Sequence, residues 1–167
     1  MTRHQAFAPL ANADTRVLVL GSLPGAQSLA ERRYYANPRN RFWQLIGEVI
    51  GQPDLPDKPY SERLDALTGA GIGLWDTIAS ATRQGSLDTA IRDVEPAALL
   101  DLAESLPNLR AIAFNGGKAA KTGRAALGPC SWALIDLPSS SPAHAAMPYT
   151  EKRDRWLALR EFLTPAP

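Results

Sequence analysis

The chain has 167 residues, of which 45% are hydrophobic and 21% charged, and its formal net charge is +1. This length fits one domain with a substantial hydrophobic core, and the composition is that of an ordinary globular protein. One cysteine and two histidines exclude a disulfide framework and are too few for the usual zinc or iron–sulfur ligand sets, so we expect neither a metal nor another cofactor.

Targeting signals are not evident in the sequence. Residues 1–14 contain no long apolar core of the kind found in signal peptides, and no apolar run reaches the roughly 20 residues of a membrane span. These patterns predict a cytoplasmic protein without a membrane partner. A net charge near zero gives no chain-wide argument for binding nucleic acid. Arg32, Arg33, Arg39 and Arg41 nevertheless form a local basic stripe that could contact phosphates, or they are simply solvated.

Apolar runs and turn residues predict strands that alternate with helices along the chain. The expected strands cover residues 16–20, 71–76, 109–114 and 132–137. The expected helices cover residues 40–50, 60–67, 96–106, 118–127 and 150–162. Pro96 would lie in the first turn of the third helix, and Thr150 would cap the last one. A polar segment is expected over residues 82–89.

This alternation favours a parallel sheet with helices on both faces. We therefore predict an α/β fold, a single three-layer α/β/α domain over residues 1–167 with a central, mainly parallel four-stranded sheet. The carboxyl ends of parallel strands meet at one edge, where such sheets bind ligands. The loops expected at this edge are residues 21–25 together with 34–40, residues 76–80, residues 115–118 and residues 138–144.

Several well-known motifs do not match at this edge. GSLPG at 21–25 lacks the GxGxxG spacing of a dinucleotide fingerprint, and NGGK at 115–118 lacks the flanking residues of a phosphate loop. The serines of these loops lie outside a GxSxG nucleophile elbow, and Asp76 has no second carboxylate for a glycosidase-type pair.

Three blocks, in order and at matching spacing, resemble the uracil-DNA glycosylase superfamily over about residues 16–162. GSLPG at 21–25 is similar to the GINPG motif of mismatch-specific uracil glycosylases, and YANPRNRFW at 35–43 is similar to the block that follows it there. LPSSSPAH at 137–144 resembles the second motif of thymine-DNA glycosylases, MPSSSAR, and GLWD at 73–76 occupies the place of a strand end that contacts the flipped base. The resemblance implies a uracil-DNA glycosylase-like fold and a DNA substrate.

One departure from the superfamily pattern concerns the attacking water. Leu23 stands where most relatives carry the Asp or Asn that positions this water, which leucine cannot do. An apolar residue there, with an intact PRNxFW block, resembles the hypoxanthine-DNA glycosylase branch, whose catalytic asparagine lies in the second block. The resemblance thereby assigns catalysis to Asn40, whose carbonyl would orient a water over the sugar. From the residues alone, the pattern favours Asn40 as the cap of the following helix, and the resemblance reverses that preference.

The resemblance also implies a base pocket and a DNA-binding surface. Tyr35 would stack on the flipped base or is an ordinary half-buried aromatic, and Asp76 would accept the N1 proton of hypoxanthine or caps a helix. Asn115 would contact the base or sugar or only begins a turn, and Lys118 would contact phosphate or is solvated. The implied base-binding residues are Gly21, Ser22, Leu23, Tyr35, Phe42, Asp76 and Asn115. The implied DNA-binding residues are Gly25, Arg39, Lys118, Ser139, Ser140, Ser141, Pro142, Ala143 and His144.

The main hypothesis is a monomeric, monofunctional DNA glycosylase of base excision repair that releases deaminated bases, hypoxanthine first, from a flipped nucleotide. The first two blocks contain no lysine that could form a Schiff base, so we expect no strand cleavage. Pro142, Ala143 and His144 form a blunt loop tip where relatives carry Leu or Arg, which predicts a preference for mispaired or single-stranded sites. The alternatives are a uracil or thymine mismatch glycosylase, an inactive damaged-DNA-binding module, and a small-molecule α/β hydrolase or nucleoside enzyme.

Overall fold

The computed structural model describes the chain except for residues 1–2, 6, 84–90, 144–145 and 164–167. The strands are β1 (Arg3–Gln5), β2 (Val17–Gly21), β3 (Ile72–Asp76), β4 (Ile78–Arg83), β5 (Ile91–Pro96), β6 (Ala111–Asn115) and β7 (Ala133–Leu137). The helices are α1 (Ala26–Glu31), α2 (Phe42–Val49), η1 (Leu55–Asp57), α3 (Tyr60–Gly69), α4 (Leu99–Ser105), α5 (Gly117–Leu127), α6 (Tyr149–Trp156), η3 (Leu157–Leu159) and α7 (Arg160–Leu163).

The central sheet contains β3, β2, β6 and β7 in that order, and every neighbouring pair is parallel. All five residues of β2 are buried. A strand covered on both faces needs apolar residues throughout, which is why the run VLVL marks β2 without any alternation. The prediction of a parallel four-stranded sheet is confirmed.

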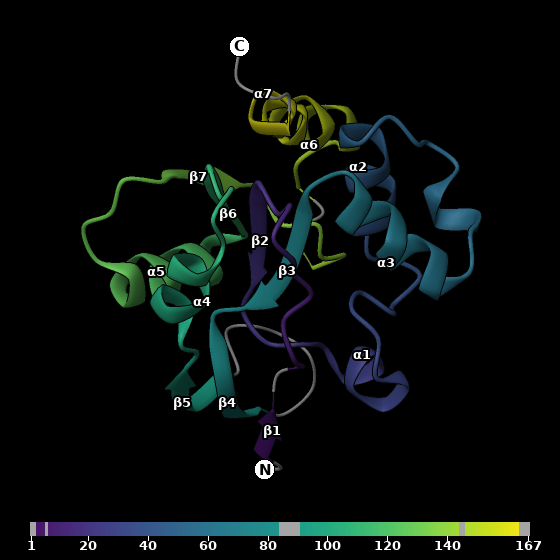
Figure 1. The fold of residues 1–167 in the computed structure, drawn as a ribbon. Helices are drawn as coiled ribbons and strands as arrows, with labels where there is room; N and C mark the ends of the chain where they lie inside the picture. The colour runs from purple at the N-terminus through teal and green to yellow at the C-terminus, as the bar shows by residue number, and fades with distance from the viewer. Residues whose placement is uncertain (1–2, 6, 84–90, 144–145, 164–167) are drawn as a thin grey trace.

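Helices cover both faces of this sheet (Figure 1), with α4 and α5 on one side and α2, α3 and α6 on the other. Successive residues of β2 point into opposite layers. Val17 and Val19 pack in the cluster of α2, α3 and α6, whereas Leu18 and Leu20 pack in the cluster of α4 and α5. The predicted three-layer α/β/α arrangement is therefore also confirmed.

A second, antiparallel sheet in the order β1-β4-β5 lies outside this prediction. β4 includes the first two residues of the polar segment expected over 82–89, whose remaining residues lie outside the described ones. β5 includes Pro96, so the expectation that a helix begins there is corrected. Pro96 ends β5, and α4 begins at Leu99. The reason is long-range pairing: the sequences of β4 and β5 lack a clear apolar alternation, so their conformation depends on the neighbouring strand.

Smaller differences concern the ends of helices. The short helix α1 lies in a stretch where no helix was predicted, and α2 begins two residues later than expected, at Phe42. The last helix is interrupted, because α6 is followed by the turn η3 and then by α7. Pro148 rather than Thr150 is the N-cap of α6. Its ring holds φ near −60°, which suits entry into a helix.

The four central strands end at the same edge of the sheet. β2 ends at Gly21 opposite Asp76, the last residue of β3, and β6 ends at Asn115 opposite Leu137, the last residue of β7. The loops that leave these residues therefore start side by side, as the sequence predicted.

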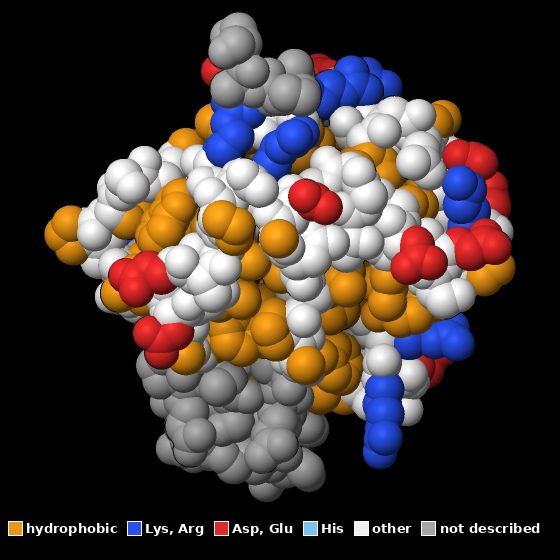
Figure 2. All heavy atoms as spheres, in the orientation of Figure 1, with side chains coloured by type: hydrophobic (Ala, Val, Ile, Leu, Met, Phe, Trp, Pro, Cys, Tyr) orange, Lys and Arg blue, Asp and Glu red, His pale blue; other side chains and the backbone are white. Residues whose placement is uncertain are grey.

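One face of the molecule shows how the charges are distributed. In Figure 2, hydrophobic side chains gather in the middle of this face, while Lys and Arg side chains lie over the C-terminal helices and toward α1. Among the described residues, no helix is both long and apolar enough to cross a membrane.

Candidate active site

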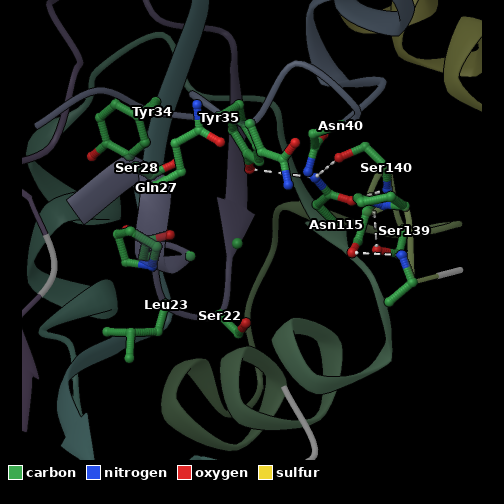
Figure 3. A pocket seen from close by; sticks show the side chains of 18 of the residues that line it. Ser22, Leu23, Gln27, Ser28, Tyr34, Tyr35, Asn40, Asn115, Ser139 and Ser140 are labelled. Atoms are coloured by element: carbon green, nitrogen blue, oxygen red, sulfur yellow. Dashed lines mark hydrogen bonds between the residues drawn. The ribbon is translucent and has the colours of Figure 1, made fainter. Parts of the chain in front are cut away.

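A cleft of about 650 Å³ opens at the carboxyl edge of the central sheet. This volume lies within the range of roughly 300–1,000 Å³ that small-molecule sites occupy. Its walls are the segment 21–28 after β2, the loop 34–40 before α2, and residues 139–143 after β7, which we call the serine loop (Figure 3). The residues from the sequence prediction that line it are Gly21, Ser22, Leu23, Gly25, Tyr35, Asn40, Asp76, Asn115, Ser139, Ser140, Ser141, Pro142 and Ala143.

Other predicted residues are placed elsewhere. Phe42 is fully buried, and Arg39 and Lys118 are not among the described residues that line the cleft. Arg39 is exposed, and its backbone N–H donates to Asn37 Oδ1. Lys118 follows the first residue of α5 and is half-buried. His144 lies outside the described residues.

Tyr35 forms an aromatic wall of the cleft. Its ring stacks on Phe42, with the ring centres 3.8 Å apart and the planes at 10°. Phe42 therefore covers one face of the Tyr35 ring. The backbone of Tyr35 has φ of +52°, in the left-handed region that non-glycine residues rarely adopt.

Asn40 lines the cleft and also bonds to the start of a helix. Its side-chain oxygen Oδ1 accepts a hydrogen bond of 2.9 Å from the backbone N–H of Phe42, the first residue of α2. The N-cap residue of α2 is Arg41, so Asn40 supports the start of the helix from one residue further out, and its role in placing a water stays a prediction. Because an N–H can only donate, this bond fixes the orientation of the amide, and Oδ1 retains its second lone pair.

Asn115, at the end of β6, joins the two sides of the cleft. Its Nδ2 donates to Ser140 Oγ at 2.9 Å and to Tyr35 Oη at 3.3 Å, and its Oδ1 accepts from the Ser140 N–H at 2.9 Å. Ser140 is fully buried, and its carbonyl accepts from the Arg41 N–H. The middle of the serine loop is thus attached both to the sheet and to the start of α2 (Figure 3).

The outer residues of the serine loop are more accessible. Ser139 and Ser141 are half-buried, and Ala143 is exposed. Ser139 Oγ accepts from the Ser141 N–H and Ser141 Oγ accepts from the Ala143 N–H, at 3.1 and 3.2 Å. These local bonds shape the loop as successive turns.

Asp76 ends β3 at the base of the cleft and is 4% exposed. The chain continues into β4, so the interpretation of Asp76 as a helix cap is wrong. A Cβ on the neighbouring Gly21 would lie 2.9 Å from Asp76 Oδ1 and 3.2 Å from Tyr35 Oη. Glycine is therefore the residue that lets these two side chains approach β2.

Tyr34 also lines the cleft and carries no charge at neutral pH. Burial raises its pKa well above the usual value, and the nearby Asp76 raises it further. Its hydroxyl donates to the carbonyl of Ala8 at 2.9 Å. Leu23, on the same side of the cleft, is buried and brings no polar group.

Some cleft residues were missed by sequence reasoning: Pro24, Ala26, Gln27, Ser28, Tyr34 and Asn37. Those from 24 to 28 belong to or precede the short helix α1, which has no apolar periodicity that could reveal it. The Tyr34–Tyr35 pair was the available signal for Tyr34. Among the described residues, no group of three His, Cys, Asp or Glu side chains is arranged to hold a metal ion.

The fold and cleft define an α/β protein with a nucleotide-sized site at the carboxyl edge of a parallel sheet. The family model described as the uracil DNA glycosylase superfamily matches residues 8–162. The chain belongs to this superfamily, and its function is that of a DNA glycosylase, with DNA as the substrate.

Individual relatives agree with this assignment. A protein named hypoxanthine DNA glycosylase from Methanosarcina barkeri is 42% identical over 116 residues, which are 70% of this chain and 73% of the relative. A protein of the same name from Methanosarcina acetivorans is 42% identical over 115 residues, which are 69% of this chain and 72% of that relative. The solution NMR structure of a candidate uracil DNA glycosylase from M. acetivorans superposes with a TM-score of 0.84 at 35% identity, covering 97% of this chain and 99% of that one.

Proposed function

We propose that the protein hydrolyses the N-glycosidic bond of deaminated bases in DNA, hypoxanthine first, as a monofunctional, monomeric enzyme of base excision repair. Two relatives named hypoxanthine DNA glycosylase support the choice of base. The observation that carries the proposal is that Asn40, Tyr35 and Asp76 line one cleft. A single nucleotide can then meet an amide, an aromatic face and a carboxylate together.

The base reaches the cleft only after its nucleotide has been flipped out of the duplex. Because Phe42 covers one face of Tyr35, the base stacks on the opposite face. Phe42 contributes as the buried support of this aromatic platform rather than by direct contact. Gly21 and Ser22 bring backbone groups close to the base, and Leu23 closes the side of the cleft.

Asp76 favours hypoxanthine over adenine. Hypoxanthine carries a proton on N1, which a carboxylate accepts, whereas adenine has no proton there. A carboxylate without such a donor would oppose the negative charge that gathers on the departing base. The burial of Asp76 makes this distinction stronger, because an unpaired contact is more costly away from water.

Asn40 orients the water that attacks the sugar. Its Oδ1 uses one lone pair on the Phe42 N–H and offers the second to the water. An amide is not a base at neutral pH, so its contribution is placement. In the reaction the water oxygen bonds to C1′ of the sugar, the C1′–N bond breaks, and the base leaves with the electron pair. The proton that the water loses ends on the departed base, so the products are a sugar with a hydroxyl at C1′ and the neutral free base.

The DNA backbone lies along the outer residues of the cleft. We assign phosphate contacts to Ser139 and Ser141 and to the charged side chains of Arg39 and Lys118, with Gly25 offering its backbone. Ser140 acts indirectly, because its side chain and backbone groups are bonded to Asn115 and Arg41. Pro142 and Ala143 lie where the wedge of a flipping loop would enter the duplex.

The test is release of hypoxanthine from a defined oligonucleotide, beside uracil, xanthine and adenine in the same sequence. Asn40→Ser keeps a side-chain oxygen that can accept from the Phe42 N–H but removes the amide, so it separates support of the helix start from placement of the water. We expect the wild type to release hypoxanthine fastest and Asn40→Ser to lose at least about 100-fold in rate, with its unfolding midpoint preserved. Asn108→Ala, which changes an exposed asparagine whose side chain donates to Ala13, is the matched control.

Faster release of uracil would replace the proposed substrate, and DNA binding without release of any base would favour an inactive binding module. Wild-type cleavage by Asn40→Ser would remove Asn40 from the mechanism. A sedimentation measurement of the enzyme alone and with DNA tests the monomer, since one chain supplies every wall of the cleft described above.

A further inference from the structure

The backbone of Tyr35 has a left-handed conformation that non-glycine residues rarely adopt. Among the described residues, Tyr35 and Arg32 are the non-glycine residues with positive φ, at +52° and +55°. Such a conformation persists only where the surroundings determine it, and it is concentrated at functional sites. Arg32 ends the short helix α1, which explains its conformation as a left-handed cap. Tyr35 is not a helix cap; it lies in a turn with Tyr34, inside the loop that lines the cleft.

Side chains from three helices bind the peptide groups around Tyr35. From α2, the Trp43 indole N–H donates to the Tyr35 carbonyl at 3.1 Å. From α3, Tyr60 Oη accepts from the Tyr34 N–H at 2.8 Å. From α1, Ser28 Oγ accepts from the Ala36 N–H at 3.0 Å. The peptide groups of three consecutive residues, Tyr34, Tyr35 and Ala36, are therefore each held by a side chain from outside the loop 34–40.

Of these three hydrogen bonds, the one from Trp43 is made to Tyr35 itself. Trp43 is 5% exposed and is not among the described residues that line the cleft, so it does not touch a bound base. Its ring packs edge-on against Phe42, with ring centres 5.0 Å apart, and against Tyr60 at 6.1 Å. The Arg63 guanidinium lies 4.8 Å from the centre of its ring. These contacts hold the indole ring in the position from which its N–H donates to the Tyr35 carbonyl.

We propose that Trp43 is a positioning residue that sets the base-stacking face of Tyr35 through this indole–carbonyl hydrogen bond. The inference rests on the proposed function and deepens it. The left-handed backbone turns the Tyr35 ring onto Phe42 and brings its hydroxyl to Asn115 Nδ2. Without the bond, the peptide relaxes toward negative φ and the ring leaves this position. The base then loses its platform although no residue that contacts it has changed.

Trp43→Phe tests the bond, because it removes the N–H and keeps an aromatic ring in the core. Trp75→Phe is the matched control: the Trp75 indole N–H also donates to a backbone carbonyl, that of Phe7, at 2.7 Å. In single-turnover release of hypoxanthine, we expect Trp43→Phe to be slower by roughly 10- to 100-fold. Its affinity for undamaged DNA should stay within about 3-fold of the wild type, since phosphate contacts dominate that binding.

A double-mutant cycle shows whether Trp43 acts through Tyr35. In a Tyr35→Ala background the platform is already absent, so adding Trp43→Phe should cost less than about 2-fold in rate. An equal further loss in that background would overturn the proposal. So would a Trp43→Phe enzyme that cleaves at the rate of Trp75→Phe. Ser28→Ala, which removes the bond on the other side of Tyr35, should show a smaller loss of the same kind.

A second measurement does not depend on activity. Backbone chemical shifts of the free protein report the sign of φ at Tyr35, which should be positive in the wild type and in Trp75→Phe and negative in Trp43→Phe. A positive φ in Trp43→Phe would overturn the inference whatever the enzyme cleaves. A wild type that releases no hypoxanthine would count against the proposed function alone.

Discussion

Substituting Gly21 by alanine adds one methyl group at the most crowded point of the cleft. The new Cβ would lie 2.9 Å from Asp76 Oδ1, whereas ordinary contacts begin at 3.4 Å, so the carboxylate must move by about 0.5 Å, the difference between the two. The same Cβ would lie 3.2 Å from Tyr35 Oη. Both side chains are buried or stacked and cannot simply swing into solvent.

Overpacking of this kind costs about 1–3 kcal/mol in stability. Because both displaced groups are proposed to hold the base, we expect the rate of hypoxanthine release to fall as well, by roughly 10-fold, since a misplacement of about 1 Å costs about 100-fold and this one is about half as large. Gly69→Ala is the matched control, since a Cβ at this last residue of α3 meets no atom within 4 Å. It should preserve the rate and leave stability unchanged or slightly higher.

The assay combines urea unfolding with single-turnover release of hypoxanthine for Gly21→Ala, Gly69→Ala and the wild type. If Gly21→Ala unfolds at the wild-type midpoint and cleaves at the wild-type rate, then Asp76 and Tyr35 do not meet at β2 as described. If Gly21→Ala lost stability but not rate, the crowding at Gly21 would be confirmed. Asp76 and Tyr35 would then have no role in recognising the base.

Two further predictions concern pH and base pairing. Burial of the Tyr34 side chain, with a smaller contribution from Asp76, raises the pKa of Tyr34 above the ordinary 10.0. The contribution of this group to stability is therefore complete below pH 10. It is lost as the pH rises above 10, at about 1.4 kcal/mol per pH unit. Tyr34→Phe should therefore make the free energy of unfolding fall less steeply above pH 10 in urea titrations, and an identical slope would contradict this. Pro142 and Ala143 make a small wedge, so release of hypoxanthine from single-stranded or mispaired DNA should match or exceed release from the best-paired duplex. Markedly slower release from the weakly paired substrates would count against this reasoning.

The central layers of the fold were predictable because their physics is local. A buried parallel strand needs an unbroken apolar run, and the run VLVL before Gly21 has the length and composition of such a strand. Helical spacing of apolar residues likewise identified α2 from Phe42 onward. The sheet of β1, β4 and β5 was not predictable, because its strands depend on partners far apart in the chain, as when Arg3 pairs with Thr82.

The site shows the same division. Motif order indicated which residues would meet at the sheet edge, but not how they share their hydrogen bonds. Ser140 could not be distinguished from Ser139 and Ser141 in a run of three serines, although only Ser140 of these is fully buried. Nor could the sequence reveal that Phe42 lies behind Tyr35. Such distinctions depend on side-chain directions that three-dimensional packing decides.

The attachment of Ser140 has a consequence for how DNA is captured. Its amide and hydroxyl are bonded to Asn115, and its carbonyl is bonded to the Arg41 N–H. The segment that we propose to meet the phosphates therefore has its shape before any encounter, and association would lose little chain entropy there. On that assignment, we expect capture to depend more on opening of the DNA helix at the lesion than on ordering of the protein, so a stiffer duplex should slow the enzyme.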